Sequence, residues 1–234
     1  MPLETFGPHC NGNGPILLGH RGASKYAPEN TFEAFDLALQ HGCDGFELDV
    51  RRTSDAKSLI CHDRDHKGKL LADCAAEKFP GLLAMEDAIA RYSSRAFINL
   101  ELKVEGLHDA VLATYQQHRP ARFLVSSFKP EALIPFYELK APFPLGLICK
   151  TEQQLSVWGQ VPIQAVIAHT SLITSELRSL TSNAGKQLFV WTVNSQNDMR
   201  RLAELEVDGI ISDDTALLAE TFGRAQPVPA GIFA

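Results

Sequence analysis

Short apolar runs alternate with amphipathic segments along most of this chain of 234 residues. Runs rich in Ile, Leu, Val and Phe are typical of buried strands, and apolar residues at three- and four-residue spacing indicate helices. The expected strands are 16–19, 45–50, 58–62, 97–102, 122–127, 144–149, 164–169, 187–193 and 209–212. The expected helices are 31–41, 84–92, 107–118, 130–139, 174–185 and 194–206. This alternation predicts an α/β protein with parallel strands.

The link between segments 45–50 and 58–62 is too short for a parallel crossover, which needs about a dozen residues. We therefore expect a hairpin there, with Asp49 opposite His62, that projects above the other strands. Eight strands remain, and repeated strand–helix units at this chain length predict a TIM (β/α)8 barrel. We expect one catalytic domain over 1–234, with a core of about 15–220 and a short extended C-terminal tail.

Composition narrows the class of protein. The net charge of -6, with 21% charged and 45% hydrophobic residues, argues against a general nucleic-acid binder. Neither an apolar stretch long enough to cross a membrane nor a signal-peptide pattern at the start is seen, so we expect a cytoplasmic protein without an integral membrane segment. The cysteines lack CxxC spacing and are expected to be small buried side chains; they are Cys10, Cys43, Cys61, Cys74 and Cys149. Oligomeric state has no signal in this sequence.

His20 and Arg21 directly follow the first expected strand. Chemistry in (β/α)8 barrels lies at the carboxyl ends of the strands, so both residues are candidates for a site. A histidine that merely ends a strand with its hydrogen bonds satisfied is an equally open interpretation at this point. Further on, Asn30 with Glu33 three positions later predicts a capped helix start.

Acidic residues mark the next two barrel strands. Glu47 and Asp49 alternate along their strand and therefore share its inward face. Glu101 and Lys103 lie in the same way at the end of the following strand. A salt-bridged rim is the structural alternative, but adjacent carboxylates in a low-dielectric mouth favour a compensating cation. An all-oxygen set suits Mg²⁺ or Ca²⁺, whereas zinc would recruit a histidine.

The return strand of the hairpin brings His62 to the same mouth. One imidazole could take a proton from an attacking oxygen while the other gives one to a leaving alkoxide. The metal ion, Arg21 and Lys103 would stabilise the negative charge of the transition state. The constellation predicts cleavage of a small-molecule phosphodiester.

The motifs "GHRGASKYAPENTFEAF", "GFELDV", "CHD" and "LELK" occur in this order, and together they resemble the glycerophosphodiester phosphodiesterase family. The likeness continues through "LVSSF", "VWTVN" and "DGIISD" and so runs from about residue 16 to 219. It implies hydrolysis of a glycerophosphodiester to glycerol 3-phosphate and an alcohol. The roles that it implies are acid and base for His20 and His62, metal ligands for Glu47, Asp49 and Glu101, and phosphate binding for Arg21 and Lys103.

Two further expectations concern the substrate. Trp191, near the end of a barrel strand, would lay its ring against the glycerol carbons. The segment from residue 63 to 100 is shorter than in most members of the family, which predicts a reduced cap insertion and a broad or unusual choice of substrate. Two alternatives stay open: a phospholipase D-like lyase that converts lysophospholipids to a cyclic phosphate, and a non-catalytic binder of phosphate ligands.

Overall fold

The computed structural model describes residues 14–224, so the expectations for Cys10, the first residues and the C-terminal tail lie outside the described residues. The strands are β1 (Ile16–Gly19), β2 (Gly45–Arg52), β3 (Ser58–Ile60), β4 (Asp65–His66), β5 (Lys69–Leu70), β6 (Phe97–Leu102), β7 (Arg122–Ser127), β8 (Leu145–Cys149), β9 (Ala165–His169), β10 (Gln187–Trp191) and β11 (Gly209–Ser212). The α-helices are α1 (Phe32–His41), α2 (Met85–Tyr92), α3 (His108–His118), α4 (Pro130–Glu138), α5 (Glu152–Leu155), α6 (Ser175–Asn183), α7 (Gln196–Glu204) and α8 (Thr215–Thr221).

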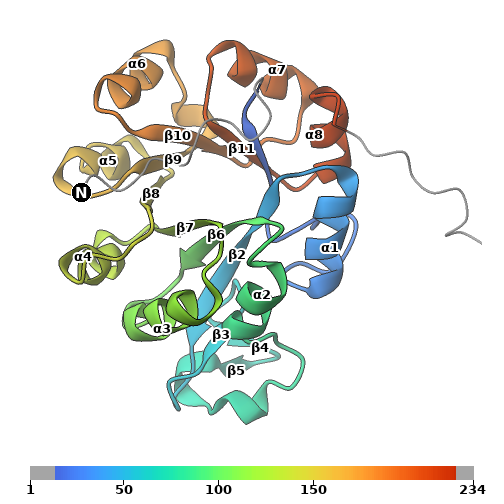
Figure 1. The fold of residues 1–234 in the computed structure, drawn as a ribbon, viewed down its shortest axis with the longest axis vertical. Helices are drawn as coiled ribbons and strands as arrows, with labels where there is room; N and C mark the ends of the chain where they lie inside the picture. The colour runs from blue at the N-terminus through green and yellow to red at the C-terminus, as the bar shows by residue number, and fades with distance from the viewer. Residues whose placement is uncertain (1–13, 225–234) are drawn as a thin grey trace, which may run out of the picture.

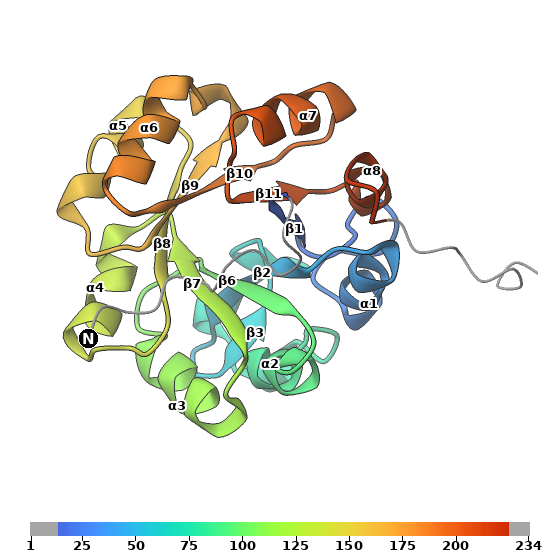
Figure 2. The same cartoon turned by 45° about the horizontal axis from the view of Figure 1, so that its top comes forward.

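Eight parallel strands close into a barrel. Their order is β1-β11-β10-β9-β8-β7-β6-β2, and a pairing of β1 with β2 completes the circle. The helices form a ring around these strands (Figure 1), and the tilted view shows β1 between β11 and β2 (Figure 2). The predicted TIM barrel is confirmed. It includes the antiparallel addition of β3 to β2 that the short link required.

The register of the hairpin differs by one residue from the expected one. Val50 pairs with Ile60, and the N–H of Cys61 donates to the carbonyl of Asp49 at 2.9 Å. Asp49 therefore lies opposite Cys61, and its expected pairing with His62 is wrong. The tip explains the difference, because the N–H of Thr53 donates to the carbonyl of Lys57 at 2.9 Å and encloses three residues, with Ala56 in the left-handed region at φ 61.

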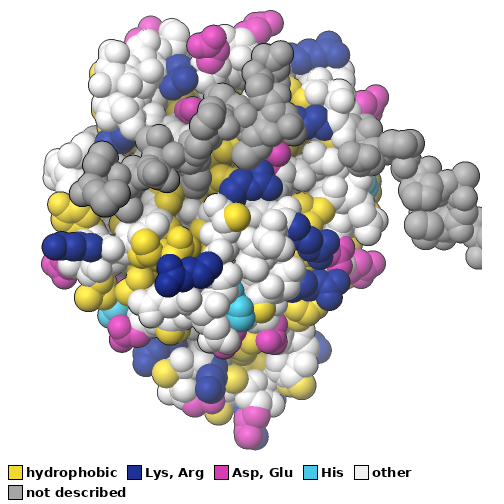
Figure 3. Space-filling model, in the orientation of Figure 1, with side chains coloured by type: hydrophobic (Ala, Val, Ile, Leu, Met, Phe, Trp, Pro, Cys, Tyr) yellow, Lys and Arg dark blue, Asp and Glu magenta, His cyan; other side chains and the backbone are white. Residues whose placement is uncertain are grey.

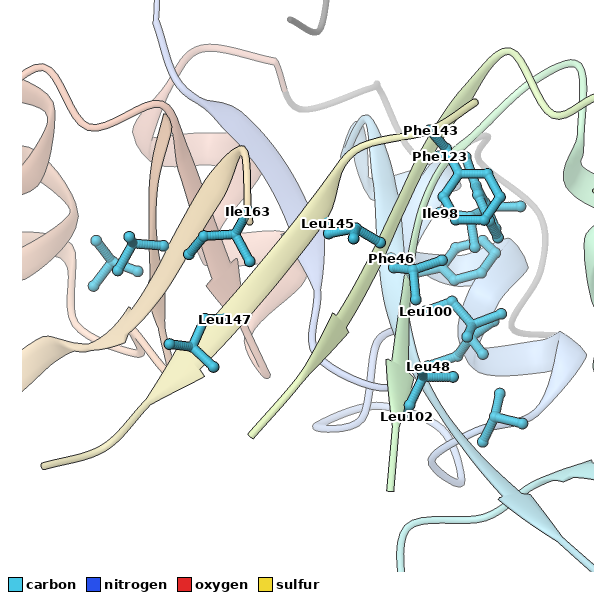
Figure 4. Close-up of a cluster of buried hydrophobic side chains, with 14 of the residues drawn as sticks. Phe46, Leu48, Ile98, Leu100, Leu102, Phe123, Phe143, Leu145, Leu147 and Ile163 are labelled. Carbon is cyan, nitrogen blue, oxygen red and sulfur yellow. The ribbon is translucent and has the colours of Figure 1, made fainter. Parts of the chain in front are cut away.

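The barrel strands are buried on both faces. Their outward apolar side chains pack beneath the helices, as Figure 4 shows for Phe46 and Leu48 of β2 beside Leu100 of β6. The inward side chains form a smaller core, made of Ile16, Leu18, Phe97, Leu124, Ile148, Ala165, Ile167, Phe189 and Ile211. Gly209 makes room within it, because a Cβ there would lie 2.1 Å from the ring of Phe189.

Helix α1 begins one residue later than the capping pattern predicts. Its N-cap is Thr31, whose hydroxyl accepts the N–H of Ala34 at 3.2 Å. Asn30 has φ 59 and turns its amide toward the barrel mouth, so the expected Asn30–Glu33 capping box is wrong. The side chain that appeared structural belongs to the site described below.

Between β3 and α2 the chain forms a small elaboration beside the hairpin. It contains the β4–β5 ribbon and two short 3₁₀ turns, Leu71–Asp73 and Ala76–Lys78. Leu71 and Phe79 are buried there against Leu59. Elsewhere, cationic and anionic side chains are interspersed on the face shown in Figure 3. None of the helices among residues 14–224 is both long and apolar enough to cross a membrane.

Candidate active site

The inward face of each strand delivers the candidate site residues to one end of the barrel. Side chains alternate along a strand, so an inward apolar residue is followed two positions later by a residue at the mouth. Phe189 is followed in this way by Trp191 on β10, and Phe97 by Asn99 and Glu101 on β6. Trp191 and Phe128 pack directly against the interior core. The site therefore lies directly above the packed apolar core inside the barrel.

Three buried carboxylates form the centre of this mouth. Glu47, Asp49 and Glu101 each offer an oxygen, and these oxygens lie within 4.8 Å of one another. The register of β2 and β6 sets this proximity, because it pairs Asp49 with Glu101. Burial, and then repulsion from Asp49 and Glu101, raises the pKa of Glu47 well above its usual value. Burial and Asp49 likewise raise the pKa of Glu101, against the opposing effect of Lys103. A cluster of this kind requires positive charge.

Arg21 and Lys103 supply part of that charge. The backbone N–H of Arg21 donates to Glu47 Oε2 at 2.9 Å, and its guanidinium Nε lies 3.3 Å from Asp49 Oδ2. Lys103 Nζ lies 2.6 Å from Glu101 Oε1 and 3.3 Å from Asp49 Oδ1. Burial opposes the charged form of Lys103, but attraction to Glu101 and Asp49 raises its pKa. Both cationic residues therefore contact the acid cluster directly.

The acid cluster could also hold a metal ion. Glu47 Oε1 is buried and has no hydrogen-bond partner among the described residues. The surrounding ligands are all carboxylate oxygens, the set that hard divalent cations prefer. Arg21 and Lys103 do not satisfy Glu47 Oε1. The guanidinium Nε of Arg21 contacts Asp49 Oδ2, and Lys103 Nζ contacts Glu101 Oε1. The donor set fits an oxygen-seeking divalent cation.

His20 is oriented by the carboxylate of Asp213, the residue directly after the last strand. Its Nδ1 lies 2.7 Å from Asp213 Oδ1. Asp213 also accepts hydrogen bonds from Asn194 Nδ2 at 2.6 Å and Ser24 Oγ at 3.1 Å. Burial would raise the pKa of Asp213, but the hydrogen bonds from His20 and Asn194 lower it to about 2. The imidazole is thus held by an ionised carboxylate at ordinary pH.

Sequence reasoning did not single out Asp213, although the barrel closure contains the necessary signal. The register of β1 and β11 pairs Gly19 with Ser212. The next residues of the two strands are His20 and Asp213, which are therefore neighbours. A predicted barrel fold does not by itself identify Asp213 as the partner of His20, because their contact depends on the register between β1 and β11.

His62 has a similar partner at the rim. Its Nδ1 lies 2.8 Å from Asp63 Oδ1, and its carbonyl accepts a hydrogen bond from Arg51 Nε at 2.9 Å. The side chain of His62 is 34% exposed. Both candidate imidazoles thus direct Nδ1 to an aspartate, which leaves Nε2 of each ring for other partners.

Asn30 and Gly22 hold the loop after β1 against the site. Asn30 is buried, and its Nδ2 donates to Asp49 Oδ2 at 2.9 Å. Gly22 has φ 83, and a Cβ there would lie 2.6 Å from the backbone of Ala34 in α1. The loop can therefore approach the helix only with a glycine at this position.

Trp191 forms an aromatic wall of the mouth. Its ring packs edge-to-face with Phe128 at a centroid distance of 5.3 Å and with His169 at 5.4 Å. The ring of His20 is 6.5 Å away. The expected placement of Trp191 at the mouth agrees with these contacts, and His169 is a neighbour that sequence reasoning did not identify.

The fold is a closed (β/α)8 barrel with a group of ionisable side chains at the carboxyl ends of its strands. The sequence matches the glycerophosphoryl diester phosphodiesterase family over residues 20–77 and 86–217. It is 27% identical over 234 residues to the glycerophosphodiester phosphodiesterase of Caldanaerobacter subterraneus subsp. tengcongensis, which covers 87% of this chain and 96% of that protein. This chain belongs to the glycerophosphoryl diester phosphodiesterase family, as its motifs predicted. It is therefore a phosphodiester hydrolase rather than a non-catalytic binder.

Solved structures agree with this assignment. The glycerophosphodiester phosphodiesterase of Thermotoga maritima has a TM-score of 0.75 and 26% identity, with 88% of this chain and 97% of that chain covered. An Oleispira antarctica phosphodiesterase, solved with its product sn-glycerol-3-phosphate, shares the fold with a TM-score of 0.78 and 23% identity. That comparison covers 90% of this chain and 97% of the other.

Proposed function

We propose that this phosphodiesterase uses His20 and His62 as its acid–base pair in a metal-dependent reaction that yields glycerol 3-phosphate and an alcohol. The observation that carries the proposal is the pair of imidazoles, each with Nδ1 on an aspartate. His20 follows β1 and His62 follows β3, and both of these strands pair with β2, which carries Glu47 and Asp49. Membership of the family supplies the reaction class.

The aspartates give the two rings a defined role. With Nδ1 of His20 held by Asp213, Nε2 is the atom that exchanges a proton with the substrate, and Asp63 has the same effect on His62. One ring accepts the proton of the attacking oxygen, and the other donates a proton to the departing alkoxide. An ionised aspartate behind an imidazole also stabilises the imidazolium form while it carries the proton.

Glu47, Asp49 and Glu101 would hold the metal ion, for which we propose Mg²⁺ or Ca²⁺ because every ligand is an oxygen. Such an ion supplies positive charge at the phosphate oxygens when it is bound. Arg21 and Lys103 now contact the carboxylates that the ion would neutralise. In the loaded site these two cations bind the phosphate of the substrate instead.

Trp191 lies beside His20 and presents an apolar surface to the mouth. We propose that it packs against the glycerol carbons of a small-molecule phosphodiester. The Oleispira phosphodiesterase, of the same fold, binds sn-glycerol-3-phosphate, which supports a ligand of this size. Between β3 and α2 the chain forms only a short ribbon and two 3₁₀ turns. We propose that this segment encloses the alcohol part of the substrate only partly, and that a broad range of alcohols is therefore accepted.

The first experiment tests the metal and the product. Chelated protein is incubated with a panel of glycerophosphodiesters, and Mg²⁺, Ca²⁺ or Mn²⁺ is restored in turn. We expect no turnover without an added ion and glycerol 3-phosphate as the phosphorus-31 NMR product with Mg²⁺ or Ca²⁺. A cyclic phosphate as the final product would instead indicate the lyase course, and undiminished activity in chelator would contradict metal dependence.

The second experiment tests the imidazoles. We expect His20→Ala and His62→Ala each to lower kcat by about 10²-fold or more, the usual contribution of a general acid or base. Both variants should stay folded, because neither ring is part of the apolar core. Only His20→Ala should lower the melting temperature by a few degrees, because it removes a hydrogen bond to Asp213. His118→Ala, in a helix on the barrel exterior, is the matched control and should keep normal turnover. Near-normal turnover in both site variants would refute the assignment.

A further inference from the structure

Arg51 occupies a position in this mouth that neither the motifs nor the acid cluster accounts for. Side chains alternate along β2, so Arg51 lies on the same inward face as Glu47 and Asp49, one step further toward the open end. Its side chain is half-buried rather than extended into solvent. The next residue, Arg52, lies on the opposite face and is exposed.

The side chain of Arg51 replaces a missing backbone contact. The last backbone hydrogen bond from the return strand to β2 runs from the N–H of Cys61 to the carbonyl of Asp49 at 2.9 Å. The chain then leaves the ladder in a bend. The following link back to β2 is the bond from Arg51 Nε to the carbonyl of His62, also 2.9 Å long.

The two imidazoles differ in how their backbones are held. The N–H of His20 donates to the carbonyl of Ser212 at 2.8 Å, so β11 fixes the backbone of this residue. His62 lies beyond the end of β3, where its carbonyl is bound by a side chain. A neighbouring strand therefore holds the backbone of His20, whereas the side chain of Arg51 holds the backbone of His62.

The charge of the guanidinium acts on both parts of the site. Its electrostatic partners include Asp49 and Asp63. Asp49 belongs to the acid cluster, and Asp63 is the partner of His62. The cation therefore acts on both groups, in addition to its hydrogen bond to the backbone.

We propose that Arg51 is a positioning residue that sets the place of the His62 imidazole relative to the acid cluster, an inference that rests on the proposed role of His62. The hydrogen bond from Nε ties the rim loop to the strand that carries Glu47 and Asp49. Without it the loop keeps its own Asp63 contact but loses its fixed distance from the carboxylates. Proton transfer depends steeply on such distances.

Two variants separate the hydrogen bond from the charge. Arg51→Gln removes both the Nε–H bond and the positive charge, whereas Arg51→Lys keeps the charge and alters the bond. Arg52→Gln is the matched control, because it removes one arginine from the same strand on the exposed face. For each variant, kcat and KM are measured, and imidazole proton–carbon NMR signals are recorded in the metal-free protein. Mg²⁺ affinity is measured by calorimetry.

We expect Arg51→Gln to lower kcat by about 10-fold or more, since misplacement of a catalytic group by about 1 Å can cost up to about 10²-fold. KM should change by less than about threefold, and the NMR signal of His62 should shift while that of His20 stays in place. Mg²⁺ should bind at least as tightly as in the parent protein, because a repelling cation is gone. Arg51→Lys should restore metal affinity to the parent value and recover part of kcat. Arg52→Gln should resemble the parent in every measurement.

A kcat within about twofold of the parent for Arg51→Gln would overturn the inference, as would a lower kcat without movement of the His62 signal. If the glutamine variant does not fold, Arg51→Lys and its NMR spectrum decide the matter in the same terms. The outcome is separable from the proposed function. Normal turnover in His62→Ala would refute the role of the imidazole, whereas an inactive His62→Ala beside a fully active Arg51→Gln would refute the role of Arg51 alone.

Discussion

Replacement of Asp213 by asparagine tests whether the carboxylate that follows β11 sets the orientation and proton affinity of the His20 imidazole. The change keeps the size of the side chain but removes its charge. In the parent protein Asp213 accepts from His20, Asn194 and Ser24. An asparagine would turn an NH₂ group toward one of these donors, so at least one hydrogen bond is lost. We therefore expect both a stability effect and a catalytic effect.

The stability effect follows from the depressed pKa of Asp213. That pKa falls from 3.8 to about 2 in the folded protein, which corresponds to about 2.4 kcal/mol at about 1.36 kcal/mol per unit. The side chain is 36% exposed, so solvent screening reduces this to about 1–2 kcal/mol. The unfolded chain takes up the proton first as the pH falls. The contribution is therefore complete above about pH 4 and is lost between about pH 4 and pH 2.

Urea unfolding at a series of pH values from 7 to 3 measures this effect. We expect the free energy of unfolding of Asp213→Asn to lie about 1–2 kcal/mol below that of the parent at pH 7, and the gap to narrow below pH 4. Asp109→Asn, with an exposed carboxylate on α3, is the control and should follow the parent curve. A gap that stays constant down to pH 3 would show that the charge of Asp213 is not its cause.

The catalytic effect follows from the orientation of His20. Without an anionic acceptor on Nδ1, the ring can adopt the wrong tautomer or rotate, and its imidazolium form loses stabilisation. We expect kcat of Asp213→Asn to fall by about 10²-fold or more while KM changes little. Turnover within about threefold of the parent would refute the role of Asp213, whatever its effect on stability.

Three other changes have equally defined outcomes. Glu47→Gln should raise the metal concentration needed for half-maximal activity by about 10-fold or more, because one anionic ligand is lost; unchanged activation would place the ion elsewhere. Trp191→Ala should raise KM for glycerophosphodiesters by about 10-fold while the melting temperature falls only slightly, and an unchanged KM would remove the ring from the substrate pocket. Gly22→Ala should lower the free energy of unfolding by about 2–4 kcal/mol, because of φ 83 and the backbone of Ala34 at 2.6 Å; full stability in urea would contradict this packing argument.

Much of the barrel is predictable because its sequence pattern is local and repeated. Strands buried on both faces appear as apolar runs, and each is followed by a helix with its own period. Polar residues inside such a run stand out, so Glu47 and Asp49 were identified from a single strand. Their inward direction followed from alternation alone, and the outward packing of Phe46 and Leu48 in Figure 4 agrees with it.

The parts that sequence reasoning missed depend on geometry between segments. Asp49 lies opposite Cys61 and not opposite His62 as expected, because the sequence does not reveal whether the hairpin tip has two, three or four residues. Asn30 fits the pattern of a helix cap, yet its amide binds Asp49 because the loop folds back over the mouth. Asp213 meets His20 only through the register of the closing strands.

The closure of β11 on β1 also orders events during synthesis of the protein. The acid cluster comes from β2 and β6 and is complete in the polypeptide once Glu101 has left the ribosome. The contact between His20 and Asp213 joins residues 193 positions apart, so it waits for almost the entire chain. A chain that ends before β11 would therefore contain all three carboxylates of the acid cluster but would lack the aspartate that binds His20.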